Sequence, residues 1–132
     1  MTLIDTSAWV EYLRATGSPT HLTLRRIIHE HEPIHTTDVV MMEVLAGGRD
    51  DAHTTTLRRL LGRCDFVPVA GLVDFEAGAA IYRTCRRHGE TIRAVNDCLV
   101  AAISIREKLD VLHADRDFDA IARHTPLQLA MP

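Results

Sequence analysis

The sequence predicts an α/β fold in which helices cover both faces of a parallel sheet. Short apolar segments typical of strands alternate with longer segments that carry apolar residues at helical spacing, almost throughout the 132 residues. No segment rich in proline, glycine or serine interrupts this alternation, and no repeat is visible. We therefore expect one domain that spans residues 1–132.

The first strand is expected at Leu3-Ile4, a short apolar pair. It ends at Asp5-Thr6-Ser7, whose side chains can accept hydrogen bonds from free backbone N–H groups and so begin a helix from Ala8 to Leu13. A second helix is indicated by apolar residues at helical spacing between Leu22 and Ile28, and Pro33 limits it.

The next strand is expected at Ile34–Thr36, and Thr37 or Asp38 should cap the helix that follows. That helix, Val39–Ala46, should end at Gly47-Gly48, because glycine readily takes the backbone angles of a helix end. A further helix is expected from about Asp51 to Leu61.

The third strand is expected at Phe66–Val69, at an edge of the sheet because Pro68 lacks a backbone N–H. A long helix from about Leu72 to Arg87 follows, and Gly89 terminates it. Residues Ala94–Glu107 then have the apolar spacing of a strong helix.

The last part of the chain continues the same alternation. Asp110–Ala114 is expected to be a strand that Asp115 closes, Phe118–Arg123 a short helix, and Leu127–Leu129 a final strand. The central parallel sheet should therefore contain four to five strands, with helices on both sides.

Composition limits the possible functions. The formal net charge is −3, which argues against binding nucleic acid through a bulk positive surface. Fourteen of the fifteen basic residues are arginine, which matches phosphate geometry, so local phosphate contacts remain available. Most of these arginines are expected on solvated helix faces. No secretory signal or membrane span is visible, so we expect a cytoplasmic protein. The three cysteines, Cys64, Cys85 and Cys98, are expected to be buried thiols that form neither disulfides nor metal ligands.

Two aspartates stand at the ends of predicted strands. Asp5 follows the first strand and Asp115 follows the strand at 110–114. In a parallel sheet the carboxyl ends of the strands meet at one crevice, where functional groups collect. Either residue alone is more often a helix cap than a metal ligand, but two at the same edge favour a site.

Two further acids lie in apolar surroundings. Glu43 has no polar neighbour within four residues on either side, and Asp97 stands in the first turn of an apolar helix. Burying a lone carboxylate is costly. Glu43 could instead pair with a core arginine, and Asp97 could simply satisfy the helix dipole. A shared cation would explain both acids together with Asp5 and Asp115.

Mg²⁺ and Mn²⁺ are the cations that such a set of carboxylates favours. A bound ion of this kind can activate water and polarise a phosphate, so no protein nucleophile is needed. The four acids Asp5, Glu43, Asp97 and Asp115 therefore suggest a metal-dependent phosphodiesterase.

Other polar residues are ambiguous. Asp117 is the better candidate for a fifth metal ligand, while Asp119 could serve only the helix dipole. Thr6, Ser7 and Asn96 could support the acids by hydrogen bonds. His113 could assist near the site, because strand alternation places it on the same face as Asp115, but a buried, hydrogen-bonded histidine is the favoured interpretation. A zinc site at His29, His31 and His35 is disfavoured, because their spacing matches no structural zinc pattern.

Four motifs occur in order along nearly the whole chain. They are Ile4-Asp5-Thr6-Ser7-Ala8-Trp9, Glu43-Val44-Leu45-Ala46-Gly47, Val95-Asn96-Asp97-Cys98-Leu99-Val100-Ala101-Ala102, and Leu112-His113-Ala114-Asp115-Arg116-Asp117-Phe118 with Ile121-Ala122. Together they resemble the PIN-domain ribonucleases, and more closely the VapC toxins of bacterial VapBC toxin–antitoxin pairs.

This resemblance implies a PIN-like α/β/α sandwich, and cleavage of RNA that depends on Mg²⁺ or Mn²⁺ and inhibits translation and growth. It also implies a toxin homodimer and a cognate VapB antitoxin whose C-terminal segment occludes the site. Position by position, the metal-binding acids would be Asp5, Glu43, Asp97 and Asp115, often with Asp117. Every acid of the pattern is present.

Three other classes of protein share part of this pattern. A response-regulator receiver would need a phosphoacceptor aspartate after the third strand, where the chain has Pro68–Gly71. A haloacid-dehalogenase-type phosphatase would need a second aspartate at the position of Ser7. A non-catalytic module that binds RNA or protein would share every feature and differ in needing no metal.

Overall fold

Four parallel strands form the centre of the computed structural model, which describes residues 1–132. They lie in the order β3-β2-β1-β4 and span β1 (Thr2–Ile4), β2 (Ile34–Thr36), β3 (Asp65–Phe66) and β4 (Asp110–Leu112). Thr2 is in register with Ile34 on one side and with Asp110 on the other. The predicted parallel sheet is confirmed, and β3 lies at its edge as expected.

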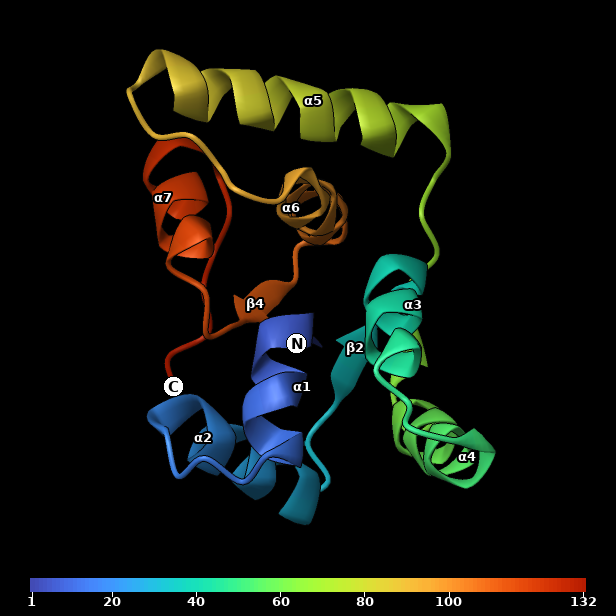
Figure 1. The fold of residues 1–132 in the computed structure, drawn as a ribbon. Coiled ribbons are helices and arrows are strands. Elements are labelled where there is room, and N and C mark those ends of the chain that lie inside the picture. Colours follow the sequence, from blue (N-terminus) through green and yellow to red (C-terminus); the bar gives the residue numbers. More distant parts are fainter.

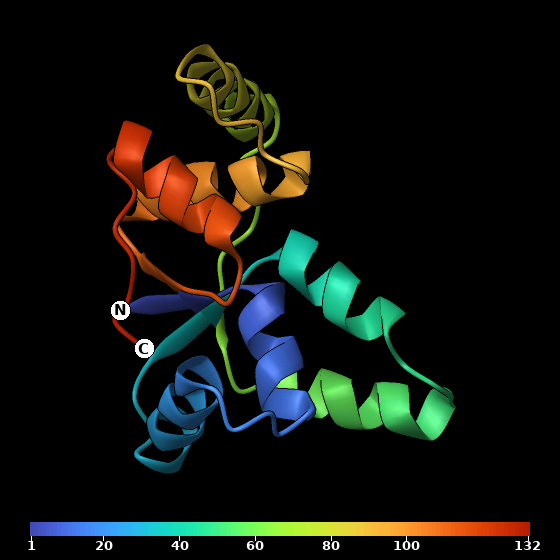
Figure 2. The ribbon, with the colours of Figure 1, turned by 60° about the vertical axis from the view of Figure 1, so that its left-hand side comes forward.

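Seven helices surround this sheet (Figure 1). They are α1 (Thr6–Leu13), α2 (Pro19–His29), α3 (Asp38–Ala46), α4 (Asp51–Leu61), α5 (Leu72–Arg87), α6 (Val95–Glu107) and α7 (Arg116–His124). In Figure 2, α5, α6 and α7 lie on one side of the strands, while α1, α2 and α4 lie on the other. Helix α3 contacts α1, α4 and α6. None of these helices is both long and apolar enough to cross a membrane.

The core lies between the sheet and the two helix groups. Its largest fully buried side chains include Trp9 from α1, Phe118 from α7 and the β1 pair Leu3 and Ile4. Burying such side chains is the main favourable contribution to folding. Strand β1 is therefore covered on both faces, and this fixes where its last residue leaves the sheet.

Helices α5 and α6 pack closely because of one glycine. Gly78 is buried, and a Cβ atom at this position would lie 3.3 Å from the backbone N and Cα of Leu99. An ion pair joins the same helices, since Arg106 donates to both carboxylate oxygens of Asp74, at 3.0 and 2.9 Å. Helix α6 is thereby fixed against α5 near its start, by the Gly78–Leu99 contact, and at its end, by Arg106.

The strand ends differ from the sequence prediction. Strand β3 stops at Phe66 instead of Val69, because Pro68 has no donor and the Val69 N–H turns to the carboxylate of Asp38 at 3.3 Å. The predicted strand 127–129 is only an isolated bridge, in which Leu129 pairs with Val111.

Strand β4 is also shorter than expected, and α7 longer. The predicted strand to Ala114 ends at Leu112, because the Ala114 N–H donates to the Ser7 hydroxyl at 2.9 Å. Helix α7 begins at Arg116. Helix α1 likewise begins at Thr6, two residues before the predicted start. These bonds to side chains draw the ends of β1 and β4 together.

Cysteine and cap predictions had mixed outcomes. All three cysteines are free thiols, as expected; Cys85 and Cys98 are buried, whereas Cys64 is only half-buried. Thr37 occupies the N-cap of α3, but its side chain makes no capping hydrogen bond.

Candidate metal centre

The candidate site lies where β1 and β4 end side by side. The loop after β1 leads into α1, whereas the loop after β4 leads into α7 on the other face of the sheet. Such a switch point leaves a crevice at the carboxyl ends of the two strands. Asp5 directly follows β1, and Asp115 follows β4 by three residues. Both residues are N-caps of the next helix.

Three aspartates meet at this crevice. Asp97 comes from the first turn of α6, Asp115 from the cap of α7 and Asp117 from its first turn. One carboxylate oxygen of each lies within 4.8 Å of the others. The Oδ2 atom of Asp97 is buried and has no hydrogen-bond partner. A buried acceptor without a donor is rare, so this atom indicates a ligand that the protein itself does not supply.

Asp5 and Glu43 extend the acidic cluster on the side of α1 and α3. Asp5 is 3% exposed, and its Oδ2 accepts hydrogen bonds from the Ser7 backbone N–H at 2.9 Å and from the Ser7 hydroxyl at 2.6 Å. Glu43 Oε1 accepts from the Thr6 hydroxyl at 2.8 Å. Burial raises the pKa of Asp5, the bonds from Ser7 oppose this, and the charge of Glu43 adds to the rise.

Asp97 is the acid most strongly affected by its neighbours. Burial, and after it the surrounding negative charges, raise the pKa of Asp97 from its ordinary value of 3.8 to about 7. Those charges belong, in decreasing order of effect, to Asp5, Asp115, Glu43 and Asp117. The four predicted acids and Asp117 therefore share one electrostatic environment. A hard divalent cation fits this environment, because it prefers carboxylate oxygens and removes their mutual repulsion.

Arg93 is a residue of this site that sequence reasoning missed. Its side chain donates to Asp115 Oδ1 at 2.7 Å and to Asp117 Oδ2 at 3.2 Å, and its backbone N–H donates to the same Asp117 oxygen at 3.0 Å. These bonds leave Asp115 Oδ2 and Asp117 Oδ1 without a hydrogen bond from the protein. Arg93 thus orients two acids and leaves one oxygen of each for a ligand. No local sequence motif indicates this role of Arg93, because its partners are 22 and 24 residues away in sequence.

The predicted supporting residues have different outcomes. Thr6 and Ser7 each bond one of the acids, as described above. Asn96 is half-buried at the start of α6, and its side chain makes no hydrogen bond. His113 is half-buried, and its Nδ1 accepts from the Asp115 N–H at 3.1 Å. Asp119 is exposed and lies 3.5 Å from His113 Nε2, outside the acid cluster.

The sequence allowed two other roles: an ion pair of Glu43 with an arginine, and a zinc site at the histidines of residues 29–35. Glu43 forms no ion pair with an arginine; its hydrogen-bond donor is the hydroxyl described above. Of the histidines near 29–35, His35 is buried with Nε2 3.8 Å from an Asp65 oxygen, whereas His29 and His31 are exposed.

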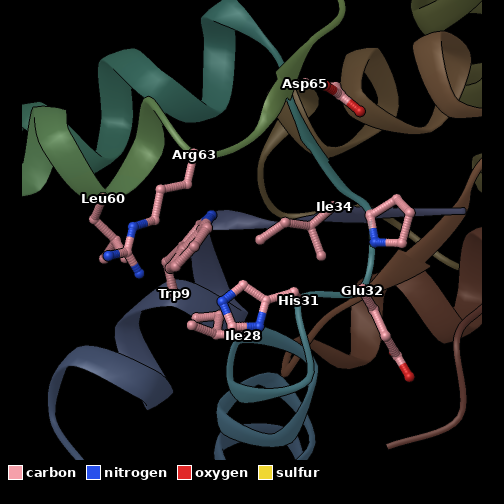
Figure 3. Close-up of a pocket in the computed structure, with 9 residues that line it drawn as sticks. Trp9, Ile28, His31, Glu32, Ile34, Leu60, Arg63 and Asp65 are labelled. Atoms are coloured by element: carbon pink, nitrogen blue, oxygen red, sulfur yellow. The ribbon is translucent and has the colours of Figure 1, made fainter.

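One hollow of the molecule lies away from the acids. It measures about 570 Å³ and adjoins the start of β2. Figure 3 shows the Trp9 indole in its wall between Arg63 and His31, while the carboxylates of Glu32 and Asp65 lie farther from the ring. A second hollow of about 340 Å³ shares Trp9 with the first and reaches the cluster. Its lining includes Thr6, Glu43, Val44, Leu13 and Leu57.

Comparison with known proteins assigns this chain to a family. The PIN domain model matches residues 2–124. Ribonuclease VapC11 of Mycobacterium tuberculosis is 50% identical over 131 residues, which cover 98% of each chain. Among solved structures, VapBC2 from Rickettsia felis bound to a promoter DNA fragment has a TM-score of 0.76 at 16% identity, covering 98% of this chain and 96% of that chain.

A second solved structure has the same fold. It is Mycobacterium tuberculosis VapC20, a Sarcin-Ricin loop cleaving toxin, with a TM-score of 0.67 at 19% identity over 97% of this chain and 99% of that chain. The two structural matches show the fold, and the 50% identity over nearly the full length shows the family. The chain therefore belongs to the PIN domain family and, within it, to the VapC ribonucleases.

Proposed function

We propose that this chain is the toxin of a toxin–antitoxin pair and hydrolyses RNA phosphodiester bonds with Mg²⁺ or Mn²⁺. The metal ligands and catalytic acids are Asp5, Glu43, Asp97 and Asp115, with Asp117 as a fifth ligand. The observation that carries the proposal is the buried Oδ2 of Asp97, which has no partner among four other acids. The VapC relatives are ribonucleases, which supports RNA as the substrate.

The residues around the acids have separate tasks. Ser7 holds Asp5, Thr6 holds Glu43, and Arg93 holds Asp115 and the fifth acid. When bound, a divalent cation would polarise the scissile phosphate and lower the pKa of a water molecule. The protein contributes carboxylates that are already close together, since one oxygen each of Asp97, Asp115 and Asp117 lies within 4.8 Å of the others.

The cytoplasm is the proposed place of action, and a VapB-type antitoxin is the proposed partner. Solved structural neighbours include VapBC complexes, which supports this partner. The hollow shared by Trp9 and Glu43 would let an extended or helical segment lie along α1 and end at the acids. The exposed apolar side chains Leu72, Val73 and Phe75 at the start of α5 offer a surface for a second copy in a homodimer.

The first experiment measures cleavage of a mixed RNA pool by purified, antitoxin-free protein. Reactions contain Mg²⁺, Mn²⁺ or EDTA, and the ends produced are mapped. Asp97→Asn should abolish cleavage, because it removes the charge of the unpartnered acid. Asp51→Asn, a matched change at an exposed first-turn acid of α4, should leave cleavage intact.

The alternative is a module that binds RNA or protein without cutting RNA. It predicts RNA binding that is equally strong in EDTA and with Asp97→Asn. Absence of cleavage by folded, metal-loaded protein across the pool, together with such binding, would contradict the ribonuclease proposal.

A further inference from the structure

A separate hollow of about 300 Å³ lies directly beside the acid cluster. Residues from the loop before α6 and from α7 line it: Glu90, Thr91, Arg93, Arg116, Asp117, Asp119, Ala120 and Arg123. Arg93 and Asp117 belong to both the hollow and the cluster. An RNA strand with one phosphate at the acids therefore has neighbouring phosphates within reach of this hollow.

The lining suits a charged ligand. Ala120 is its only apolar residue, and three arginines contribute to it. Arg93 and Arg123 are ordered by ion pairs, the latter with Glu90, whereas exposed Arg116 makes no ion pair or hydrogen bond. A guanidinium group matches the geometry of phosphate oxygens, and Arg116 is free to turn toward one.

The charge of the hollow depends on the metal centre. Three acids, Glu90, Asp117 and Asp119, balance the three arginines when no cation is bound. A cation shared by Asp97, Asp115 and Asp117 would offset the charge of the acid nearest the hollow. The arginines would then be in excess. This explains how a chain with a net charge of −3 could bind RNA at one place without a general basic surface.

We propose that this hollow is a binding subsite for the RNA backbone, where Arg116, supported by Arg93 and Arg123, contacts a phosphate next to the one that is cleaved. The subsite rests on the proposed ribonuclease function. The hollow of about 570 Å³ at the start of β2 is a poorer place for phosphate, because apolar side chains supply much of its lining.

The test uses Arg116→Gln, because Arg116 has no contact in the free protein that its loss would break. Binding of a fluorescent oligoribonucleotide that the wild type cleaves is measured by anisotropy in Ca²⁺, under conditions in which no product forms. We expect affinity to fall about 3- to 10-fold and the slope of log affinity against log salt to decrease by about 0.7. Arg116→Lys should keep the slope, and Arg59→Gln, at an exposed position on α4, should change neither quantity.

A second measurement separates RNA contact from an effect on the metal. Mn²⁺ affinity, followed by electron paramagnetic resonance without RNA, should be equal in Arg116→Gln and wild type. A neutral methylphosphonate beside the cleaved position should weaken wild-type binding but not weaken Arg116→Gln further.

Measurements on Arg116→Gln and on the wild type can overturn the subsite. Unchanged RNA affinity and salt slope in Arg116→Gln would contradict it. A loss of Mn²⁺ affinity in this variant as large as its loss of RNA affinity would contradict it as well. A wild-type protein that cleaves no RNA would remove the ribonuclease function and the subsite together, whereas normal cleavage with an unaffected Arg116→Gln would remove the subsite alone.

Discussion

Asp97→Asn should stabilise the metal-free protein increasingly as the pH rises from 5 to 8. Burial and the neighbouring acids raise the pKa of Asp97 from 3.8 to about 7 in the folded protein. Between these values the folded state holds a proton that the unfolded state has released. The free energy of unfolding therefore falls as the pH rises through this window, and the full stability is present only below it.

The magnitude follows from the width of the window. The whole interval from 3.8 to about 7 would correspond to about 4 kcal/mol at 1.4 kcal/mol per pH unit. Because the Asp97 side chain is only partly buried, solvent screening should reduce this to about 2 kcal/mol. Roughly two thirds of the window lies above pH 5. Asparagine cannot ionise, so its advantage should grow by about 1 to 1.5 kcal/mol between pH 5 and pH 8.

Urea unfolding in EDTA, followed by circular dichroism at several pH values, measures this difference. Asp51→Asn is the control, because it makes the same change at an exposed acid of a helix start that lies outside the acid cluster. A difference between Asp97→Asn and wild type that stays constant, or shrinks with pH, would refute the electrostatic account. Added Mg²⁺ should stabilise the wild type more than the variant.

Three further substitutions test the surroundings of the site. Ser7→Ala removes one of two hydrogen bonds to Asp5 and the bond that the hydroxyl accepts from the Ala114 N–H, so it should cost about 1 to 2 kcal/mol in urea unfolding and weaken Mn²⁺ binding. Equal Mn²⁺ affinity would contradict a supporting role. Arg106→Leu leaves Asp74 buried and unpaired, which should lower the free energy of unfolding by about 3 kcal/mol, and a loss below about 1 kcal/mol would argue against this. Gly78→Ala should cost about 1 to 3 kcal/mol, because its methyl group meets the backbone of α6, and an unchanged thermal midpoint would show that the helices can separate freely.

The helices were the most predictable part of the fold. The predicted bounds of α4 and α5 agree with the structure at both ends, and β2 agrees as well. Each of these segments is enclosed by local signals that act within a few residues, such as Pro33 before β2 or the glycines after the helices. Such signals act through the backbone conformations that proline and glycine favour, so they can be recognised from the sequence alone.

The strand ends were less predictable because distant groups decide them. Val67–Val69 has the composition of a strand, yet the Val69 N–H bonds Asp38, 31 residues away. Ala114 leaves β4 to bond Ser7, 107 residues away. Contacts of this kind exist only once the sheet has formed, so they cannot be predicted from the pattern of apolar residues.

The same distinction applies to the candidate site. The acids could be proposed from the sequence, because a carboxylate such as Glu43 in an apolar segment is costly unless something binds it. Arg93 could not be proposed, because an exposed arginine before a helix is ordinary and only its long-range bonds to Asp115 and Asp117 give it a role. Asn96 shows the converse: it adjoins an acid in sequence and bonds none of them.

The support given to the acids is uneven, and this has a mechanistic consequence. Neutral hydroxyl donors hold Asp5 and Glu43, and a guanidinium holds Asp115 and Asp117, but nothing holds the buried oxygen of Asp97. A bound cation would therefore contribute most at Asp97, where it would replace a proton. Metal binding should accordingly release a proton from this carboxyl and strengthen as the pH rises toward 7. Asp97, whose burial among other acids destabilises the metal-free protein, is thus the residue through which the ion would stabilise the fold.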